Sequence, residues 1–140
     1  MGFVRGLVQK ALRIEASTIE NTPIGAVTPS TGAFSGLSLS VTSVAAAGST
    51  DADAASLGAG INIVSAADGT KGVKLPTAVA GKVVIVKGTA NAILKVYPNT
   101  GDGINELTVT TGALSMAAKT AAIFVAADAT TWYSIPLLPS

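Results

Sequence analysis

Residues 82–87 read KVVIVK, four consecutive β-branched residues between two lysines. Successive side chains of a strand point to opposite faces, so Val84 and Val86 would share one face, and Val83 and Ile85 the other. A strand that is apolar on both faces is generally buried on both. The run therefore predicts a strand whose first face belongs to the core and whose second face meets a neighbouring subunit.

Short runs of the same kind recur along the chain at a spacing of roughly ten residues, each bounded by turn residues. Their connections are too short for crossover helices. The pattern predicts an all-β fold, an antiparallel β-sandwich or barrel of jelly-roll-like type. The expected strands are residues 37–46, in which Leu37, Leu39 and Val41 alternate with polar residues, and INIVS (61–65), KGVKL (71–75), KVVIVK (82–87), AILKVY (92–97), INELTVT (104–110), AAIFVA (121–126) and TTWYSI (130–135).

Several side chains can be assigned to faces from this pattern. Leu94 and Val96 should face the core, which leaves Ile93, Lys95 and Tyr97 on a second surface. The single tryptophan, Trp132, is expected to be a core anchor. The small-residue stretch AAAGSTDADAASLGAG that follows the first strand is interpreted as a loop.

The first 36 residues differ from the rest, which predicts two parts, residues 1–36 and 37–140. Residues 1–14 carry an apolar stripe at helical spacing, so a short amphipathic helix is expected, folded onto its own domain or docked on another subunit or a membrane surface. Residues 16–36 contain Pro23 and Pro29 and read as an extended arm. The apolar residues of both segments are the candidate contacts with other proteins: Val4, Leu7, Val8, Ile14, Ile19, Ile24, Val27 and Phe34.

Composition favours an assembly of protein subunits. Only 12% of residues are charged and 49% are hydrophobic, and such a surface is better suited to another protein than to water. We therefore expect self-association, as a homotrimer. The net charge of +1 gives no electrostatic case for nucleic acid. No membrane span or signal peptide is expected, because basic residues interrupt the opening stretch and the uncharged stretch 21–50 is broken by proline.

The chain contains no His and no Cys, which removes the commonest general base, thiolate chemistry and zinc ligands. No nucleophile motif is present, so no enzymatic activity, cofactor or metal is expected. Gly58-Ala59-Gly60 is interpreted as a β turn rather than a nucleotide loop. Asp51-Ala52-Asp53 lacks the glycine and glutamate of a calcium loop. Five lysines, namely Lys71, Lys74, Lys82, Lys87 and Lys95, form either a basic patch or protection of strand edges, and we favour protection.

The stretch VKLPTAVAGKVVIVKGTANAILKVYPNTGDGIN (73–105), followed by AIFVA and TTWYSI, resembles a β module of tailed-phage virion proteins. The resemblance spans roughly residues 60–135 and implies capsid decoration proteins, head fibres or tail fibre tips. The residues that carry it are Leu75-Pro76, Gly81, Val96-Tyr97-Pro98, Gly101, Ile104-Asn105 and Trp132.

Together these features predict a capsid decoration (cement) protein on the virion surface that binds the major capsid protein. The alternative is a tail or head fibre component that recognises a host surface. A fibre tip would be expected to present an aromatic platform, and the chain has only one Trp, two Tyr and three Phe. A sugar-processing enzyme that uses two carboxylates is a distant third.

Overall fold

The computed structural model describes residues 38–137, and this part of the chain is all β, with ten strands and no helix. The expected helix and arm within residues 1–36 lie outside the described residues. No helix long and apolar enough to span a membrane occurs in the described part. The strands are β1 (Val41–Ala45), β2 (Ala55–Ser56), β3 (Gly60–Ser65), β4 (Gly72–Lys74), β5 (Val83–Gly88), β6 (Leu94–Tyr97), β7 (Gly103–Ile104), β8 (Leu114–Met116), β9 (Ala121–Ala126) and β10 (Thr131–Leu137).

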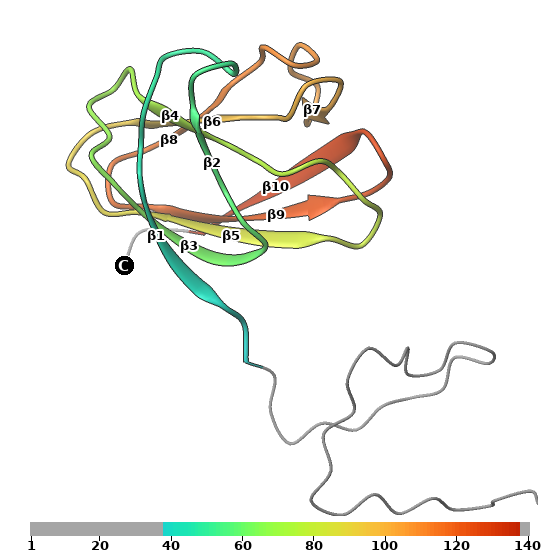
Figure 1. Ribbon diagram of the computed structural model, residues 1–140, viewed down its shortest axis with the longest axis horizontal. Coiled ribbons are helices and arrows are strands. Elements are labelled where there is room, and N and C mark those ends of the chain that lie inside the picture. Colours follow the sequence, from blue (N-terminus) through green and yellow to red (C-terminus); the bar gives the residue numbers. More distant parts are fainter. Residues whose placement is uncertain (1–37, 138–140) are drawn as a thin grey trace, which may run out of the picture. The chain divides into compact units, whose positions relative to one another are not determined.

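The strands form two sheets, seen one above the other in Figure 1. The six-stranded sheet has the order β1-β3-β5-β9-β10-β7, and the four-stranded sheet has the order β2-β4-β6-β8. From β1 to β9 the chain changes sheet with every strand, so consecutive strands do not pair with each other. Most strands instead pair with the strand one coil earlier or later, as β1 does with β3 and β2 with β4, whereas β9 pairs with β5 and with its successor β10.

This winding makes the sheets mixed rather than antiparallel, so the expectation of an antiparallel fold was wrong. β1, β3 and β5 run parallel in one sheet, and β2, β4 and β6 run parallel in the other. Parallel neighbours need a crossover, and connection length had argued against one. Here a strand of the opposite sheet makes the crossover in place of a helix. Antiparallel pairing is confined to β5–β9, β9–β10 and β6–β8.

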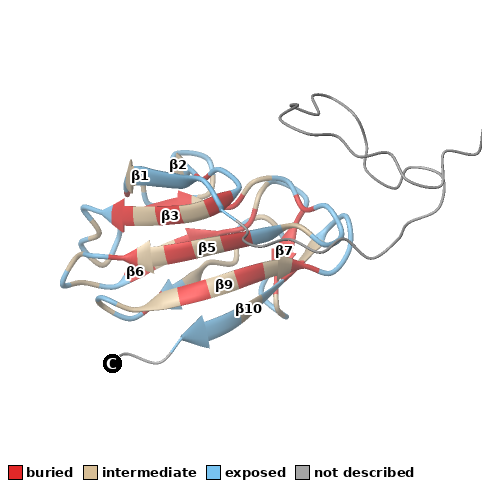
Figure 2. Ribbon diagram, turned by 90° about the horizontal axis from the view of Figure 1, so that it is seen from below, coloured by how far each residue is buried: buried red, intermediate tan, exposed pale blue. Residues whose placement is uncertain are grey.

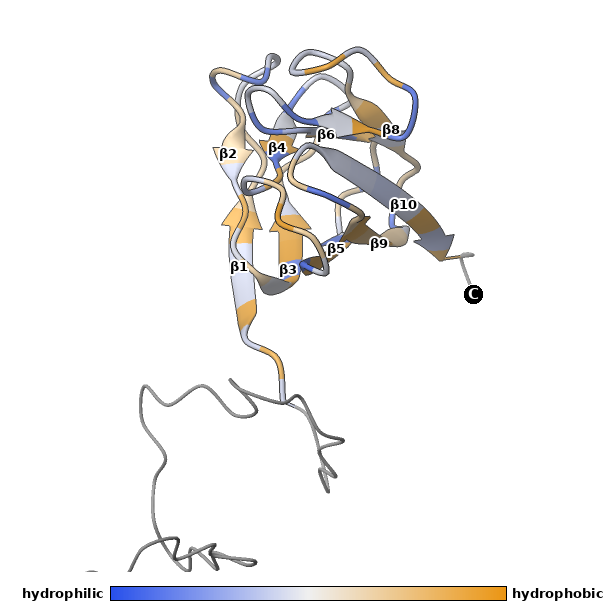
Figure 3. Cartoon of the chain, turned by 90° about the vertical axis from the view of Figure 1, so that its right-hand side faces the viewer, coloured by the Kyte–Doolittle hydropathy of each residue, from blue (hydrophilic) through white to orange (hydrophobic). Residues whose placement is uncertain are grey.

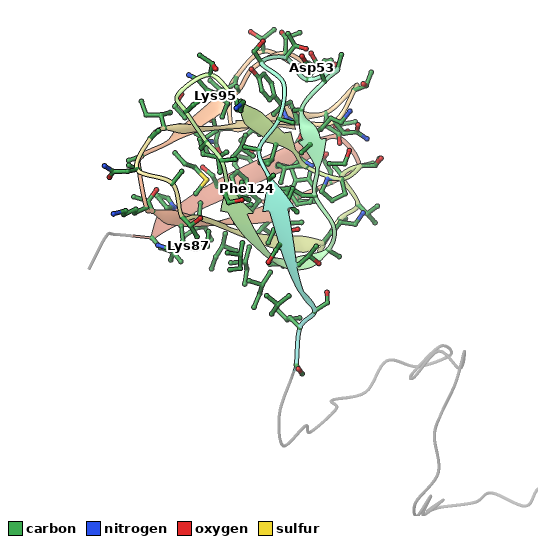
Figure 4. All side chains as sticks on the ribbon, turned by 60° about the vertical axis from the view of Figure 1, so that its left-hand side comes forward. Asp53, Lys87, Lys95 and Phe124 are labelled. Atoms are coloured by element: carbon green, nitrogen blue, oxygen red, sulfur yellow. The ribbon has the colours of Figure 1, made fainter. Side chains whose placement is uncertain are left out.

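One hydrophobic core is shared by both sheets. Val84 and Val86 of β5 are fully buried, as are Leu94 and Val96 of β6, which confirms the faces predicted for these two strands. Trp132 is fully buried, as expected of a core anchor. Figure 4 shows Phe124 of β9 in the interior, with Lys87, Lys95 and Asp53 at the periphery.

The sequence pattern misplaced three segments. Residues 104–110 contain only the short strand β7, because Asn105 and Thr110 have positive φ angles that end the strand and turn the chain. In the first strand Leu39 and Val41 are exposed, and Val44 of the opposite parity packs on the core. The stretch expected to be a loop contains β2, whose two residues are too few to show a period.

Two side-chain contacts fix the coils against each other. The carboxamide of the buried Asn62 accepts a hydrogen bond from Gly58 N and donates one to Gly58 O, which closes the turn before β3. Tyr97 lies on the same face of β6 as Lys95, as predicted, but it is buried there, because its ring lies over Gly72 and its hydroxyl donates to Ser49 O. Burial, together with the nearby acidic residue Asp53, raises the pKa of the Tyr97 hydroxyl.

Candidate functional site: the outer face of the six-stranded sheet

An apolar row runs across five strands of the six-stranded sheet on the face turned away from the core. The pairing register aligns Val41 with Ile61, Ile61 with Ile85, Ile85 with Ile123, and Ile123 with Ile135. We call these five residues the isoleucine row. In β3, β5 and β9 the residues on either side of the row are buried in the core, which places the row on the outer face.

Two further rows flank the isoleucine row and complete what we call the outer face. One row is Val83, Val125 and Tyr133, and the other is Ser43, Ile63, Lys87, Ala121 and Leu137. Lys87 is the one charged residue of the thirteen positions, and its Nζ donates to the carbonyl of Lys119. Figure 2 shows β1, β3, β5, β9 and β10 side by side, with buried and half-buried residues alternating along the central strands.

Large side chains of the outer face are accessible to solvent. Val41 is 64% exposed, Ile135 52% and Tyr133 50%. Ile61, Ile85 and Ile123 are half-buried because neighbouring strands flank them. Figure 3 shows hydrophobic stretches along β1 and β3. The largest contiguous apolar patch on a protein surface is often functional, so this face is the candidate interaction surface.

The outer face of the four-stranded sheet has the opposite character. Its register gives two short rows, Ser56, Lys74 and Tyr97 in one and Gly72, Lys95 and Ser115 in the other. Lys95 Nζ donates to Ser115 Oγ at 2.8 Å across the sheet. The two sheets use their inner faces for one core, but only the six-stranded sheet is apolar on both faces. The asymmetry makes the outer face of the six-stranded sheet the candidate surface for contact with another protein.

The two edges of the six-stranded sheet also differ. At one edge, the two-residue strand β7 covers only the start of β10. Beyond it, the N–H of Ser134 donates to Asn105 Oδ1 at 3.1 Å, and the next outward-facing position is Pro136, which has no N–H. That edge is therefore blocked against a further strand. At the β1 edge, VTSVA (41–45) has neither charge nor proline, and no described strand pairs with its outer side. The open edge borders the outer face.

The five lysines considered as a patch are not gathered on one surface. Lys71 pairs with Asp68 at 3.2 Å, Lys82 Nζ donates to Thr77 O, and Lys87 and Lys95 have the partners already given. Lys74 lies on the outer face of the four-stranded sheet. The interpretation as protection of strand edges was wrong, because Lys74, Lys87 and Lys95 lie on interior strands and the other two lie outside strands.

Three aspartates in the described part of the chain form hydrogen bonds within the loops that contain them. Asp53, Asp68 and Asp128 each accept hydrogen bonds from backbone N–H groups and a threonine hydroxyl two or three residues away. These bonds hold the pKa of each carboxyl below its usual value. The buried Asp102 accepts a bond from Ala78 N at 2.8 Å, which ties two loops together. Asp51 and Asp53 therefore belong to a structured turn, and among residues 38–137 no cluster of three potential metal ligands occurs.

A small apolar cleft of about 280 Å³ opens between β8 of one sheet and β9 and β10 of the other. Leu114, Met116, Ala122, Pro136 and Leu137 line it, together with small polar residues, and none of its lining residues is titratable. Pockets for small ligands are usually larger and carry a few convergent polar groups. The cleft suits an aliphatic side chain better than a substrate.

Comparison of the chain with family models, with curated proteins and with solved structures finds no match. The function is therefore inferred from its own residues. The candidate contacts predicted from sequence, Val4, Leu7, Val8, Ile14, Ile19, Ile24, Val27 and Phe34, lie outside the described residues. The isoleucine row was not foreseen beyond Ile85. The sequence does contain an indication of the row. Residues 61–65 and 121–126, like 82–87, have apolar residues at both odd and even positions, so both faces of each strand carry apolar side chains.

Proposed function

We propose that this chain is a phage capsid decoration (cement) protein that binds and stabilises the assembled head through protein–protein contacts, as a homotrimer on the capsid surface. The observation that carries the proposal is the outer face of the six-stranded sheet, an apolar surface in a body in which Asp53, Asp68 and Asp128 are hydrogen-bonded within their own loops. Such a body suits binding and offers little for catalysis. We propose no enzymatic activity and no cofactor.

The mechanism is thermodynamic. A protein that binds the assembled shell, and not its free subunits, stabilises the shell by mass action. Many copies on one particle add their contributions, and several contacts per trimer raise the effective affinity of each. A compact, sandwich-like body of two sheets would sit outside the shell, and the major capsid protein would be the partner beneath it.

Residues 1–36 are the segment proposed to bind the capsid. They contain the eight apolar candidate contacts and precede the first strand of the β body. Segments of this composition commonly order on a partner, and apolar contacts offset the entropy that is lost. The sequence resemblance to virion β modules supports the same setting, although it does not extend to these residues.

Removal of residues 1–36 tests this assignment. The truncated protein should remain soluble with a cooperative melt, and it should no longer bind capsids that lack the protein. Leu7→Asp should weaken binding without changing the melt, because it places a charge on the apolar stripe. Gln9→Asp is the matched control, since it places the same charge on the opposite helical face. Full occupancy by the truncated protein would show that the capsid-binding surface lies elsewhere.

A fibre component remains the second candidate because of one feature of the fold. The alternation of parallel strands between two sheets, with Val41, Ile61 and Ile85 stacked in successive coils, is the winding used by β-solenoids. Solenoids extend by adding coils and are suited to fibres. In this chain, however, the antiparallel strands β9 and β10 follow the coils in the six-stranded sheet.

A further inference from the structure

We infer that the outer face of the six-stranded sheet is the surface through which copies of this chain bind one another. The inference rests on the proposed function and deepens it, because it assigns self-association to the β body and leaves capsid binding to residues 1–36. The occupant of the face is the same face of other copies.

The chemistry of the face favours a second copy over a different protein. Twelve of its thirteen positions are uncharged, and the one ammonium group, on Lys87, is engaged by a carbonyl of its own chain. Recognition of a different partner usually relies on charged and polar groups that fix orientation and exclude competitors. Two uncharged apolar faces can pack against each other without matched charged or polar groups. The more apolar interfaces are those of permanent homo-oligomers.

The need to stay soluble before the shell forms also favours a second copy as the occupant of the face. A decoration protein must persist in solution until a shell is available, and an open apolar patch would promote aggregation during that time. Another copy is present from synthesis onward at the same concentration, so it can cover the face at once. A capsid-binding surface, in contrast, must stay available until the shell has formed.

The size of the face sets how much of an interface it can supply. Five strands about 4.8 Å apart and three rows about 7 Å apart give a footprint on the order of 500 Å². Three copies that turn this face toward a common axis would bury on the order of 1,500 Å² in total, or about 500 Å² for each pair, so the contact must extend beyond the face to reach the range of specific interfaces. The edge at β1 is open, whereas the exposed side of β10 is blocked beyond β7, so the contact would extend on the β1 side.

The test compares charge substitutions on the two outer faces by light scattering at micromolar concentration. The wild type should give about three times the chain mass of 13.7 kDa. Ile123→Lys, in the middle of the row, and Ile135→Lys, at a position 52% exposed, should each give the mass of one chain. Ser115→Lys, on the exposed outer face of the four-stranded sheet, should leave the mass unchanged. Ile135→Lys decides the result if Ile123→Lys does not fold.

The inference is overturned if the wild type is a monomer, or if both row variants keep the wild-type mass. Loss of mass in Ser115→Lys as well would also contradict it, since the effect would not be specific to the face. A wild-type mass of two chains that falls to one in the row variants supports the surface and contradicts the trimer. A wild type that associates through the face but does not bind capsids refutes the proposed function and leaves this inference standing.

Discussion

Ile85 of β5 lies directly opposite Ile123 of β9, and both side chains stand on the outer face of the sheet. The next pair along the same two strands, Val84 and Phe124, is fully buried in the core. One pair of strands therefore contributes to two apolar surfaces. Folding of the chain buries the inner surface, and the outer surface is the one proposed to bind other copies of the chain.

Substitution of the two neighbours on β9 should separate these roles. Phe124→Ala should lower the free energy of unfolding by about 3–5 kcal/mol at any protein concentration, because it leaves a cavity in the core. Ile123→Ala should cost about 1 kcal/mol or less in the isolated chain, on the scale of strand propensity. Its larger effect should be on the oligomer, so that its melting temperature is lower and depends on concentration less steeply than that of the wild type. Thermal melts over a hundredfold range of concentration measure both effects.

Gly72 should not tolerate a side chain. A Cβ there would lie 2.6 Å from Cε2 of Tyr97 and 2.9 Å from the backbone oxygen of Lys95. Gly72→Ala should therefore destabilise the fold by about 1–3 kcal/mol, as overpacking does. Gly88→Ala is the matched control, because its Cβ would meet nothing closer than 3.7 Å. Equal urea midpoints for the two variants would show that the Tyr97 ring does not pack on Gly72 as described.

Loss of the two hydrogen bonds between Asn62 and Gly58 should destabilise the fold. Asn62 is fully buried and satisfies both the N–H and the C=O of Gly58. Asn62→Leu is close in size but leaves both backbone groups without this partner, so we expect a loss of about 1–3 kcal/mol. Ser134→Ala should cost less, because the Ser134 N–H that donates to Asn105 is retained. Chemical denaturation of the two variants provides the comparison, and a neutral Asn62→Leu would contradict the assigned role.

Stability should be constant from pH 5 to 8 and fall below about pH 4. The chain has no histidine, so no side chain with an ordinary pKa titrates in the first range. The pKa values of Asp53, Asp68 and Asp128 are lowered in the folded state, so their stabilising effect is complete above the unfolded value of about 3.9. It is lost as the pH falls toward the folded values. Melting temperatures at half-unit steps test this, and Asp68→Ala should reduce the acid dependence.

The sequence predicted the local structure of most strands but not their arrangement. The period of two is clear in residues 82–87 and 121–126, where β-branched and aromatic residues are dense. Parallel pairing could not be predicted from the sequence. The length of a connection limits how two consecutive strands can pair, but here consecutive strands mostly lie in different sheets. β2 is too short for any period.

The candidate site was predicted in part. The second apolar face of β5 was recognised at Val83 and Ile85, and the structure places both on the outer face. The full row depends on register, which aligns Val41 and Ile135 with Ile85 although they lie far apart in the sequence. Residues 105–110 were misread because the positive φ of Thr110 is unusual for a β-branched residue, and sequence pattern does not reveal it.

The proposed function is tested most directly by the number of copies of this chain in purified virus particles that contain it. Quantitative mass spectrometry against the major capsid protein would give that number for the head and for the separated tail. A decoration protein should be present in the head in hundreds of copies, in a fixed ratio to the capsid protein. A few copies confined to the tail would contradict the account and favour the fibre component.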